Sequence, residues 1–316
     1  MNAGNFQRRQ VSVPADGAAM NPTGPSLLIA GCGYLGMQLA RLTSQYGWDV
    51  CAITRSESSA QSIMAELGIP VAVADLGDTA SLRQARAQLP AVACVVHAAS
   101  SSRGGLDAYQ KVFIDGLANL SAVFAPERLV FTSSTSVYAQ TDGSIVDENS
   151  PAEGASPTSR LLLEAECLAL RQGGTVARLA GLYGPSRSVV LRKFLLGTAV
   201  IEEGGTRYLN QIHRDDAATA VLHLLNHPSA PGGIFNVSDN TPLSQRATYE
   251  GLARHFQRPL PPEGPKPEGR KRGWSSKRVS NHKLRALGWK PLYPSFLAAV
   301  ATDDILVTSN LEPELG

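Results

Sequence analysis

The sequence predicts an α/β protein whose core is a doubly wound parallel sheet, with a smaller lobe toward the C-terminus. Short, nearly continuous apolar runs alternate with segments whose apolar residues recur at helical spacing. This alternation is typical of parallel strands that helices bury on both faces. A turn with three glycines joins the first apolar run to the first helical segment. With 316 residues, the chain is long enough for one main domain and a smaller appended lobe.

Five strands are predicted in the first half of the chain, each separated from the next by a helical segment. The strands are expected at 26–30, 49–53, 71–74, 92–96 and 129–132. The first helix carries an apolar stripe at Leu35, Leu39 and Leu42, and the fourth extends across roughly 107–124. Right-handed crossovers between such strands bring their carboxyl ends to one edge of the sheet, where ligands bind.

The second half begins with a loop rich in Asp, Glu, Ser and Pro at about 141–157. A helix at 159–171 and a strand at 175–179 follow, and shorter pieces of helix and strand are expected at 189–196, 208–212, 217–225 and 234–237. We therefore expect a disordered lead-in at 1–25, a main domain at 26–185 with return segments near 213–240, a smaller lobe at 186–212 and 241–300, and a tail at 301–316.

The composition argues against a nucleic-acid-binding protein and against a membrane protein. The chain is 43% hydrophobic and 18% charged, with a formal net charge of +2, which is typical of a soluble globular protein and gives no basic footprint for nucleic acid. No apolar run approaches the length of a membrane span, and residues 1–25 lack the apolar core of a secretory signal. We expect a cytoplasmic protein that binds neither nucleic acid nor membrane.

The four cysteines are Cys32, Cys51, Cys94 and Cys167, and no two of them form a CxxC pair. Three of the four fall in predicted strands or in the glycine turn. Buried, reduced thiols are therefore expected rather than a disulfide framework or a metal site.

The segment Gly31-Cys32-Gly33-Tyr34-Leu35-Gly36 has the spacing of a dinucleotide-binding turn. Gly31 suits a tight turn, Gly33 allows the backbone to approach a pyrophosphate, and Gly36 allows close packing of helix on strand. Tyr34 and Leu35 open the helix, whose N-terminal N–H groups favour an anion. The pattern predicts a Rossmann-type nucleotide site, the alternative being a purely structural glycine turn.

The residue after the second strand discriminates between the two nicotinamide dinucleotides. An acidic side chain there binds a ribose 2′-hydroxyl, whereas an arginine accommodates a 2′-phosphate. This chain has Arg55 followed by Ser56, and a guanidinium beside a hydroxyl suits a phosphate. We predict NADP(H) in preference to NAD(H). A solvated role for Arg55 and a different nucleotide, such as FAD, remain open.

Several further segments, taken together, give a family resemblance. They are Ala74-Asp75-Leu76, His97-Ala98-Ala99-Ser100, Thr132-Ser133-Ser134-Thr135-Ser136-Val137-Tyr138, Arg178 to Pro185, Ile212 to Ala217, and Phe235-Asn236-Val237. With the glycine turn, they resemble the extended (atypical) short-chain dehydrogenase/reductase family of NAD(P)-dependent epimerases, dehydratases and reductases. The resemblance covers about residues 26–300.

The resemblance implies roles for individual residues. Asp75 and Leu76 would contact the adenine. Ala98, Ala99 and Ser100 would lie along the cofactor. Ser134 falls on the position of the family's catalytic Ser/Thr. Homodimers are common in this family, and a homodimer is expected here on that ground.

The family's catalytic Tyr-x-x-x-Lys pair is missing. In the best register, Ser156 stands at the tyrosine position and Arg160 at the lysine position. Arg160 has the donors to hold ribose hydroxyls. Ser156 is no chemical substitute, because the pKa of an alcohol lies far above the value of about 10 for tyrosine, and general catalysis needs a pKa near the working pH.

Other groups are candidates for the missing proton donor. Tyr138 lies near Ser134, although the resemblance implies that it is a packing residue. His213 opens a predicted helix, at which Asp215 or Asp216 is the expected N-cap. Glu148 in the acidic loop is either a solvated charge or a substrate contact.

Tyr183, Arg187 and Arg270 are the candidate substrate contacts. Arg187 and the basic group around Arg270 suit a phosphate or a carboxylate, the alternative being a solvated loop, and Tyr183 has turn packing as its alternative. Two functions follow. One is an NADP(H)-dependent oxidoreductase or epimerase-like enzyme acting on a small polar substrate, nucleotide-linked or not. The other is a catalytically inactive NADP(H)-binding sensor or regulatory protein.

Overall fold

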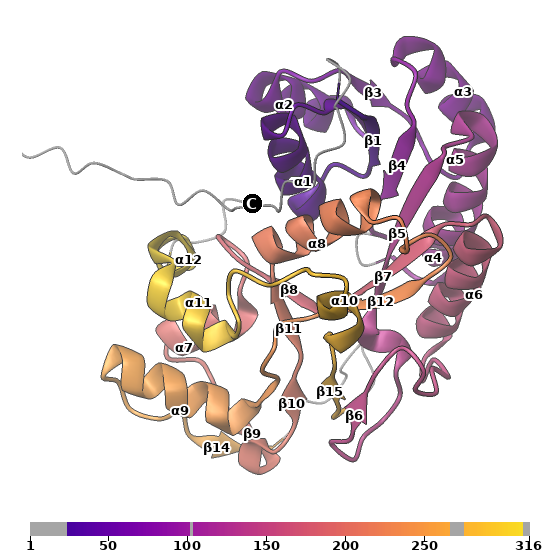
Figure 1. The fold of residues 1–316 in the computed structure, drawn as a ribbon. Coiled ribbons are helices and arrows are strands. Elements are labelled where there is room, and N and C mark those ends of the chain that lie inside the picture. Colours follow the sequence, from indigo (N-terminus) through magenta and orange to yellow (C-terminus); the bar gives the residue numbers. More distant parts are fainter. Residues whose placement is uncertain (1–23, 102–103, 266–274, 312–316) are drawn as a thin grey trace, which may run out of the picture.

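The computed structural model describes residues 24–101, 104–265 and 275–311. Its centre is a sheet of seven parallel strands in the order β12-β7-β5-β4-β1-β2-β3 (Figure 1). The strands are β1 (Ser26–Ala30), β2 (Asp49–Thr54), β3 (Val71–Val73), β4 (Cys94–His97), β5 (Arg128–Ser134), β7 (Thr175–Leu179) and β12 (Ile234–Val237). The predicted doubly wound parallel sheet is confirmed, and its strand order reverses between β1 and β4.

Helices cover both faces of this sheet. On one face lie α1 (Tyr34–Gln45), α2 (Glu57–Leu67) and α8 (Arg214–Asn226), and on the other lie α3 (Thr79–Gln88), α5 (Gly116–Phe124) and α6 (Pro157–Arg171). The predicted stripe of the first helix does face the sheet, because Leu35 and Leu39 are buried in the first of these layers. Leu82 and Leu117 are fully buried in the second.

The helix expected across 107–124 is not a regular α-helix. It consists of α4 (Leu106–Tyr109), a π-helical turn at Gln110–Asp115, and α5. The buried His97 places its Nε2 atom 2.9 Å from the carbonyl oxygen of Val112 in that turn. A side chain bonded to a helix carbonyl is a physical reason for such a local widening.

The acidic segment at 141–157 includes a short strand, β6 (Ile145–Val146). It pairs in parallel with β15 (Arg278–Val279), so two segments far apart in the sequence lie side by side. The Oε1 atom of Glu148 accepts a hydrogen bond of 2.6 Å from the backbone N–H of Asn236 in β12. The loop is thereby attached both to the C-terminal region and to the sheet.

A third apolar cluster lies outside the sheet. It joins α7 (Val189–Leu195), α9 (Gln245–Phe256), α11 (Phe296–Thr302) and α12 (Asp304–Ser309) (Figure 1). The remaining elements are β8 (Gly181–Tyr183) with β11 (Gln211–His213), β10 (Tyr208–Leu209) with β13 (Leu243–Ser244), β9 (Ile201–Glu202) with β14 (Glu263–Gly264), and α10 (His282–Ala286). The pair β8–β11 leads from the sheet to this cluster.

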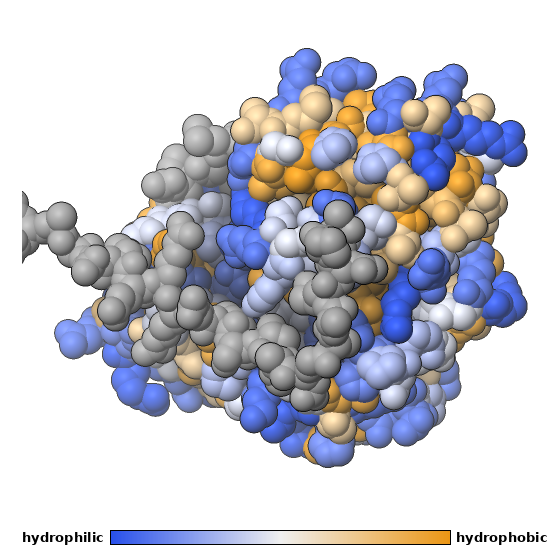
Figure 2. All heavy atoms as spheres, turned by 45° about the horizontal axis from the view of Figure 1, so that its top comes forward, coloured by the Kyte–Doolittle hydropathy of each residue, from blue (hydrophilic) through white to orange (hydrophobic). Residues whose placement is uncertain are grey.

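The surface is mixed in character. Figure 2 shows one face of the molecule, on which hydrophobic side chains gather in patches bordered by hydrophilic ones. Among the described residues, no helix has the length and apolar character needed to cross a bilayer.

Candidate functional site: the glycine turn and its surroundings

The glycine turn lies where the strand order of the sheet reverses. Gly31 follows β1 with a φ of +94°, and a Cβ atom there would stand 2.3 Å from the Cα of Ala99 after β4. A Cβ on Gly36 would stand 2.6 Å from the carbonyl oxygen of Gly31. Both positions therefore require glycine, for backbone conformation at Gly31 and for close packing at both.

Gly33 differs from its two neighbours in the motif, because a Cβ there would meet nothing within 4 Å. The helix that begins after it, α1, has no side-chain cap and no acidic residue in its first turn. By contrast, Ser56 caps α2 and Ser156 caps α6. Open space beside uncapped N–H groups fits the diphosphate of a dinucleotide, so the residues present suit the cofactor that the motif implies.

The predicted adenosine end of the site gathers at the ends of β2 and β3. Arg55 and Asp75 follow these paired strands, and Leu76 is buried beside them. Asp75 accepts hydrogen bonds from the backbone N–H of Gly77 at 3.0 Å and from Lys111 Nζ at 2.6 Å. Burial raises the pKa of Asp75, but these bonds and the nearby charges of Lys111 and Arg55 outweigh it and hold that pKa below its usual value. Sequence reasoning missed Lys111, because nothing in its helix marks it as a neighbour of Asp75.

Ala98, Ala99 and Ser100 lie at the reversal point of the sheet. The backbone N–H of Ala98 donates to the carbonyl of Ala30 at 2.8 Å, which fixes this segment beside β1. Ser100 is exposed. The three residues therefore border the turn that the motif predicts as the cofactor's seat.

Ser134 ends β5 and is half-buried. Its hydroxyl oxygen accepts a hydrogen bond of 3.1 Å from the backbone N–H of Ser136, which caps a short 3-10 turn. Within the part of the chain that the structure describes, this hydroxyl donates no hydrogen bond, so its proton is available to a ligand. Ser134 thus stands at the carboxyl edge of the sheet with a fixed backbone and a free O–H.

Behind Ser134 lies a buried polar network that the sequence did not reveal. Arg178 and Glu166 form an ion pair of 2.6 Å whose side chains are 4% and 2% exposed. Glu166 also accepts a hydrogen bond of 2.5 Å from the hydroxyl of Ser133. The network fixes β5, β7 and α6 to one another directly beneath the Ser134 segment.

Tyr138 belongs to this network. Its hydroxyl donates to Asn236 Oδ1 at 2.9 Å and accepts from Arg178 Nη1 at 2.9 Å, and its side chain is buried. Burial raises the pKa of Tyr138, although the charge and hydrogen bond of Arg178 oppose that rise. Its hydroxyl is fully engaged inside the protein, which supports the packing role over proton donation.

Ser156 and Arg160 begin α6. The hydroxyl oxygen of Ser156 accepts from the backbone N–H of Ser159 at 3.1 Å, so Ser156 is the N-cap of the helix. Arg160 lies one turn further on an exposed position, with Nη1 3.5 Å from the carbonyl oxygen of Gly154. Ser156 thus has a structural role as the helix cap, and the guanidinium of Arg160 lies at the surface.

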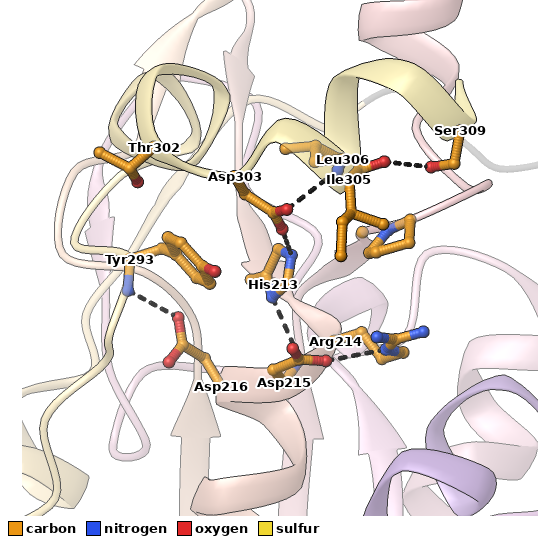
Figure 3. Close-up of polar contacts among 12 residues, drawn as sticks. His213, Arg214, Asp215, Asp216, Tyr293, Thr302, Asp303, Ile305, Leu306 and Ser309 are labelled. Carbon is orange, nitrogen blue, oxygen red and sulfur yellow. Dashed lines mark hydrogen bonds and ion pairs between the residues drawn. The ribbon is translucent and has the colours of Figure 1, made fainter. Parts of the chain in front are cut away.

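The prediction that Asp215 or Asp216 is the N-cap of α8 was wrong. His213 caps the helix, because its Nδ1 accepts from the backbone N–H of Asp215 at 3.2 Å (Figure 3). The Nε2 of this fully buried histidine lies 3.2 Å from Asp303 Oδ2. Asp216 instead accepts from the backbone N–H groups of Leu292 at 2.6 Å and Tyr293 at 3.0 Å, and so anchors the C-terminal segment. A short side chain was expected as the cap, and the histidine ring reaches the same N–H.

Two of the candidate substrate contacts lie in different surroundings, one buried and one exposed. Tyr183 is 2% exposed and packs edge-on against His213 and Phe296, which supports its packing role. Arg187 is exposed, and its Cζ lies 5.0 Å from the centre of the Tyr34 ring. Arg270 lies outside the described residues.

Glu148 is partly buried, and its Oε1 is occupied by the hydrogen bond from the Asn236 N–H. Burial raises its pKa, against which the hydrogen bond from Asn236 acts. Lys277, which belongs to the basic group near Arg270 in the sequence, is buried: its Nζ donates to the carbonyl of Tyr138 at 2.7 Å and to Ser275 Oγ at 3.1 Å. Burial lowers the pKa of Lys277 to about 8.

The four cysteines are free thiols, three of them buried as expected. Burial raises the pKa of Cys32, inside the glycine turn, to about 12, although Arg41 opposes the rise. This thiol is therefore un-ionised and packs against Met37, with its Sγ 3.7 Å from the Met37 Sδ.

Comparisons with known proteins identify the family and agree with the fold. The model of the NAD dependent epimerase/dehydratase family matches residues 27–238. Protein YeeZ of Escherichia coli strain K12 is 29% identical over 237 residues, which cover 72% of this chain and 82% of YeeZ.

Solved structures show the same fold. A Methylobacillus flagellatus protein, assigned provisionally to the NAD-dependent epimerases/dehydratases, has a TM-score of 0.70 at 26% identity, covering 88% of this chain and 96% of that one. The UDP-glucose 4-epimerase of Bifidobacterium longum, in complex with NAD+ and UDP, has a TM-score of 0.71 at 17% identity, covering 90% and 97%. The matched family region runs from β1 to the end of β12 and includes the glycine turn and Ser134. The chain belongs to the NAD dependent epimerase/dehydratase family.

Proposed function

We propose that the protein is an NADP(H)-dependent oxidoreductase of the epimerase/dehydratase type acting on a small polar substrate. The observation that carries this proposal is the pairing of an open glycine turn with a free serine hydroxyl at the same edge of the sheet. Gly33 has space for a diphosphate, and Ser134 keeps its O–H available. When bound, the nicotinamide supplies or accepts hydride.

The preference for NADP(H) rests on Arg55 and its surroundings. Arg55 follows β2, next to the serine-capped start of α2. A hollow of about 300 Å³ lies between the glycine turn and α2, the helix that begins after Arg55 and Ser56, and it is lined by Cys32, Ser58 and Ser59, among others. A guanidinium with hydroxyl groups nearby can neutralise and hydrogen-bond a 2′-phosphate.

The residues of this chain would divide the work as follows. The Ser134 hydroxyl donates a hydrogen bond to a substrate oxygen and so stabilises negative charge that develops there. Arg160, exposed at the start of α6, binds ribose hydroxyls. Ser156 supplies no acid, because the pKa of an alcohol lies far above the working pH, and its oxygen caps the helix. Losing general acid–base help costs about 10²–10⁴ in rate, so we expect slow turnover unless the substrate supplies the proton.

Cofactor choice is tested by calorimetry with NADP+, NAD+ and FAD on the natural chain and on Arg55→Gln. We expect NADP+ to bind most tightly and the substitution to weaken NADP+ about tenfold or more while leaving NAD+ little changed. Arg83, an exposed arginine on α3, provides the matched control, Arg83→Gln. Equal affinity of the natural chain for both dinucleotides would contradict the preference.

Chemistry is tested by following cofactor absorbance with a panel of sugar nucleotides and small carbonyl compounds. Ser134→Ala should reduce turnover by about 10²-fold or more while NADP+ affinity stays the same. Clear NADP+ binding without turnover of any panel member would count against catalysis.

A non-catalytic NADP(H)-binding sensor or regulatory protein is the second candidate. It is supported by the use of Ser156 as a helix cap and by the absence of a Tyr-x-x-x-Lys pair in the sequence. If this candidate is right, a cellular phenotype of the natural chain will be unaffected by Ser134→Ala and abolished by Arg55→Gln.

We also infer that the protein forms a homodimer, as is common in the family. The hydrophobic patches on the face in Figure 2 support an interaction surface. Light scattering coupled to size exclusion should give twice the chain mass of 33.5 kDa.

A further inference from the structure

We propose that Arg187 and Arg214 together form a binding site for a phosphoryl group, built around the ring of Tyr34. The inference deepens the proposed function and rests on it for one point: Tyr34 lies inside the turn that would hold a dinucleotide. Three elements far apart in the sequence meet here. They are the turn after β1, the loop after β8, and the start of α8.

The tyrosine ring is the centre of the arrangement. The Cζ of Arg187 lies 5.0 Å from its centroid, and the Cζ of Arg214 lies 5.3 Å from it. The Tyr34 hydroxyl donates a hydrogen bond of 3.0 Å to the carbonyl of Pro185, which holds the ring against the loop. Two guanidinium groups beside one ring bring two positive charges close to the same side chain, and an anion that contacts both would reduce their mutual repulsion.

Two carboxylates, those of Asp215 and Asp303, also act on the Tyr34 ring, and of the two arginines Arg214 forms an ion pair. Asp215 accepts from Arg214 Nε at 2.8 Å, and Asp303 lies 3.2 Å from His213 Nε2 while accepting from the backbone N–H of Leu306 at 3.0 Å (Figure 3). In the described ranges, no carboxylate pairs with Arg187, whose side chain is exposed beside the ring. The exposed guanidinium of Arg187 is therefore the group that an anionic ligand can reach.

The loop that carries Arg187 is held in an unusual conformation. Gly184 has a φ of +156°, and a Cβ there would stand 2.5 Å from the Tyr34 hydroxyl oxygen. Ser186 has a φ of +60°, a left-handed conformation that costs a residue with a side chain free energy. Such conformations persist where surrounding contacts enforce them, and they concentrate at ligand sites.

The enforcing contacts come from the end of α12. Ser309 Oγ accepts from the backbone N–H of Ser186 at 2.7 Å, and Asn310 Oδ1 accepts from the backbone N–H of Ser188 at 2.7 Å. The buried Asn310 also donates to the carbonyl of Gly184 at 3.2 Å. The C-terminal helix thus presets the loop, which lowers the cost of ordering Arg187 when a ligand binds.

Guanidinium groups bind phosphoryl oxygens through two parallel hydrogen bonds, and the stacked ring limits their motion. The phosphoryl group has two sources. One is the diphosphate of the dinucleotide, which approaches the same turn. The other is a phosphate on the substrate. Both sources share one chemistry, and the experiment separates them.

The test measures binding by calorimetry for the natural chain, Arg187→Gln and Arg214→Gln. Arg285→Gln is the matched control, because Arg285 is an exposed arginine on α10. The three probes are NADP+ alone, inorganic pyrophosphate alone, and UDP in the presence of saturating NADP+. Circular dichroism checks that each variant is folded.

We expect each site substitution to weaken one phosphoryl probe by about 10- to 100-fold, as for the loss of a charged hydrogen bond. Weaker NADP+ binding together with competition by pyrophosphate identifies the cofactor's diphosphate as the source. Unchanged NADP+ binding with weaker UDP binding identifies the substrate.

The proposal is overturned if Arg187→Gln and Arg214→Gln bind all three probes like Arg285→Gln, or if the natural chain binds none of them. Failure of the proposed function looks different. In that case NADP+ does not bind the natural chain, yet pyrophosphate does, and the substitutions still weaken it.

Discussion

At the residue scale, the buried ion pair of Arg178 and Glu166 explains how the Ser134 segment is held without any covalent cross-link. Each charge is almost fully removed from water, so each depends on the other and on its hydrogen bonds from Ser133 and to Tyr138. A pair of this kind adds little net stability over a well-packed apolar replacement, but breaking it leaves an uncompensated buried charge. The pair therefore fixes geometry more than it adds stability.

Replacing one partner tests this directly. Arg178→Met should lower the free energy of unfolding by about 3–5 kcal/mol, because Glu166 is left buried and unpaired. The double variant Arg178→Met/Glu166→Leu should recover a large part of that loss, since both charges are then gone. Urea unfolding followed by circular dichroism gives both values. A double variant no more stable than Arg178→Met would contradict this account.

At the element scale, the C-terminal segment is attached to the main sheet by buried carboxylates. Asp239, just after β12, accepts from the backbone N–H of Thr241 at 3.1 Å and also from that of Phe296, the first residue of α11. Burial raises the pKa of Asp239 to about 7, although these hydrogen bonds oppose the rise. Burial likewise raises the pKa of Asp216 to about 6, against its bonds to Leu292 and Tyr293.

This arrangement predicts a pH dependence of stability. Because the pKa of Asp239 is higher in the folded chain than in the unfolded chain, its stabilising contribution is complete below about pH 4 and is lost as the pH rises through about 7. Asp239→Asn cannot ionise. As the pH rises from 4 to 8, the free energy of unfolding of Asp239→Asn should therefore increase by about 1–4 kcal/mol relative to that of the natural chain.

Urea unfolding at several pH values measures this difference. The exposed Asp304 in the first turn of α12 provides the matched control, Asp304→Asn. Parallel pH profiles for Asp239→Asn and the natural chain would show that Asp239 does not titrate as described.

Some of these elements could be predicted from the sequence and others could not. The strands of the sheet and the helix α1 were predictable, because apolar runs and a helical stripe determine them locally. The π-helical turn was not, because it depends on His97 at the end of β4 reaching the carbonyl of Val112 in that turn. Helix α9 was not predicted either. Its buried residues Tyr249 and Leu252 pack against α7 and α11 and not against the sheet.

The candidate site follows the same rule. Gly31, Gly33 and Gly36 were predictable, because one short motif contains all three. Arg214 and Lys111 were not, because each meets its partner only through the fold: Tyr34 for Arg214 and Asp75 for Lys111. His213 was expected beside an aspartate cap and is itself the cap, since ring reach depends on backbone geometry that the sequence does not fix.

At the scale of the whole molecule, the turn between β1 and α1 is contacted by three regions. They are the end of β4 through Ala99, the loop after β8 through Pro185, and α8 through Arg214. A dinucleotide bound at this turn would contact only the folded chain, because the unfolded chain does not bring these regions together. Ligand binding should therefore raise the stability of the whole fold.

The expected stabilisation by the dinucleotide follows from its concentration relative to its dissociation constant. NADP+ at 100 times its dissociation constant stabilises the folded state by about 2.7 kcal/mol. For a domain of this size the midpoint of thermal unfolding, Tm, should rise on the order of 5 °C. NAD+ at the same concentration should raise Tm less, and Arg55→Gln should reduce the NADP+ effect to that of NAD+. Thermal unfolding followed by circular dichroism measures all three, and an equal rise with both dinucleotides would contradict selection of the 2′-phosphate by Arg55.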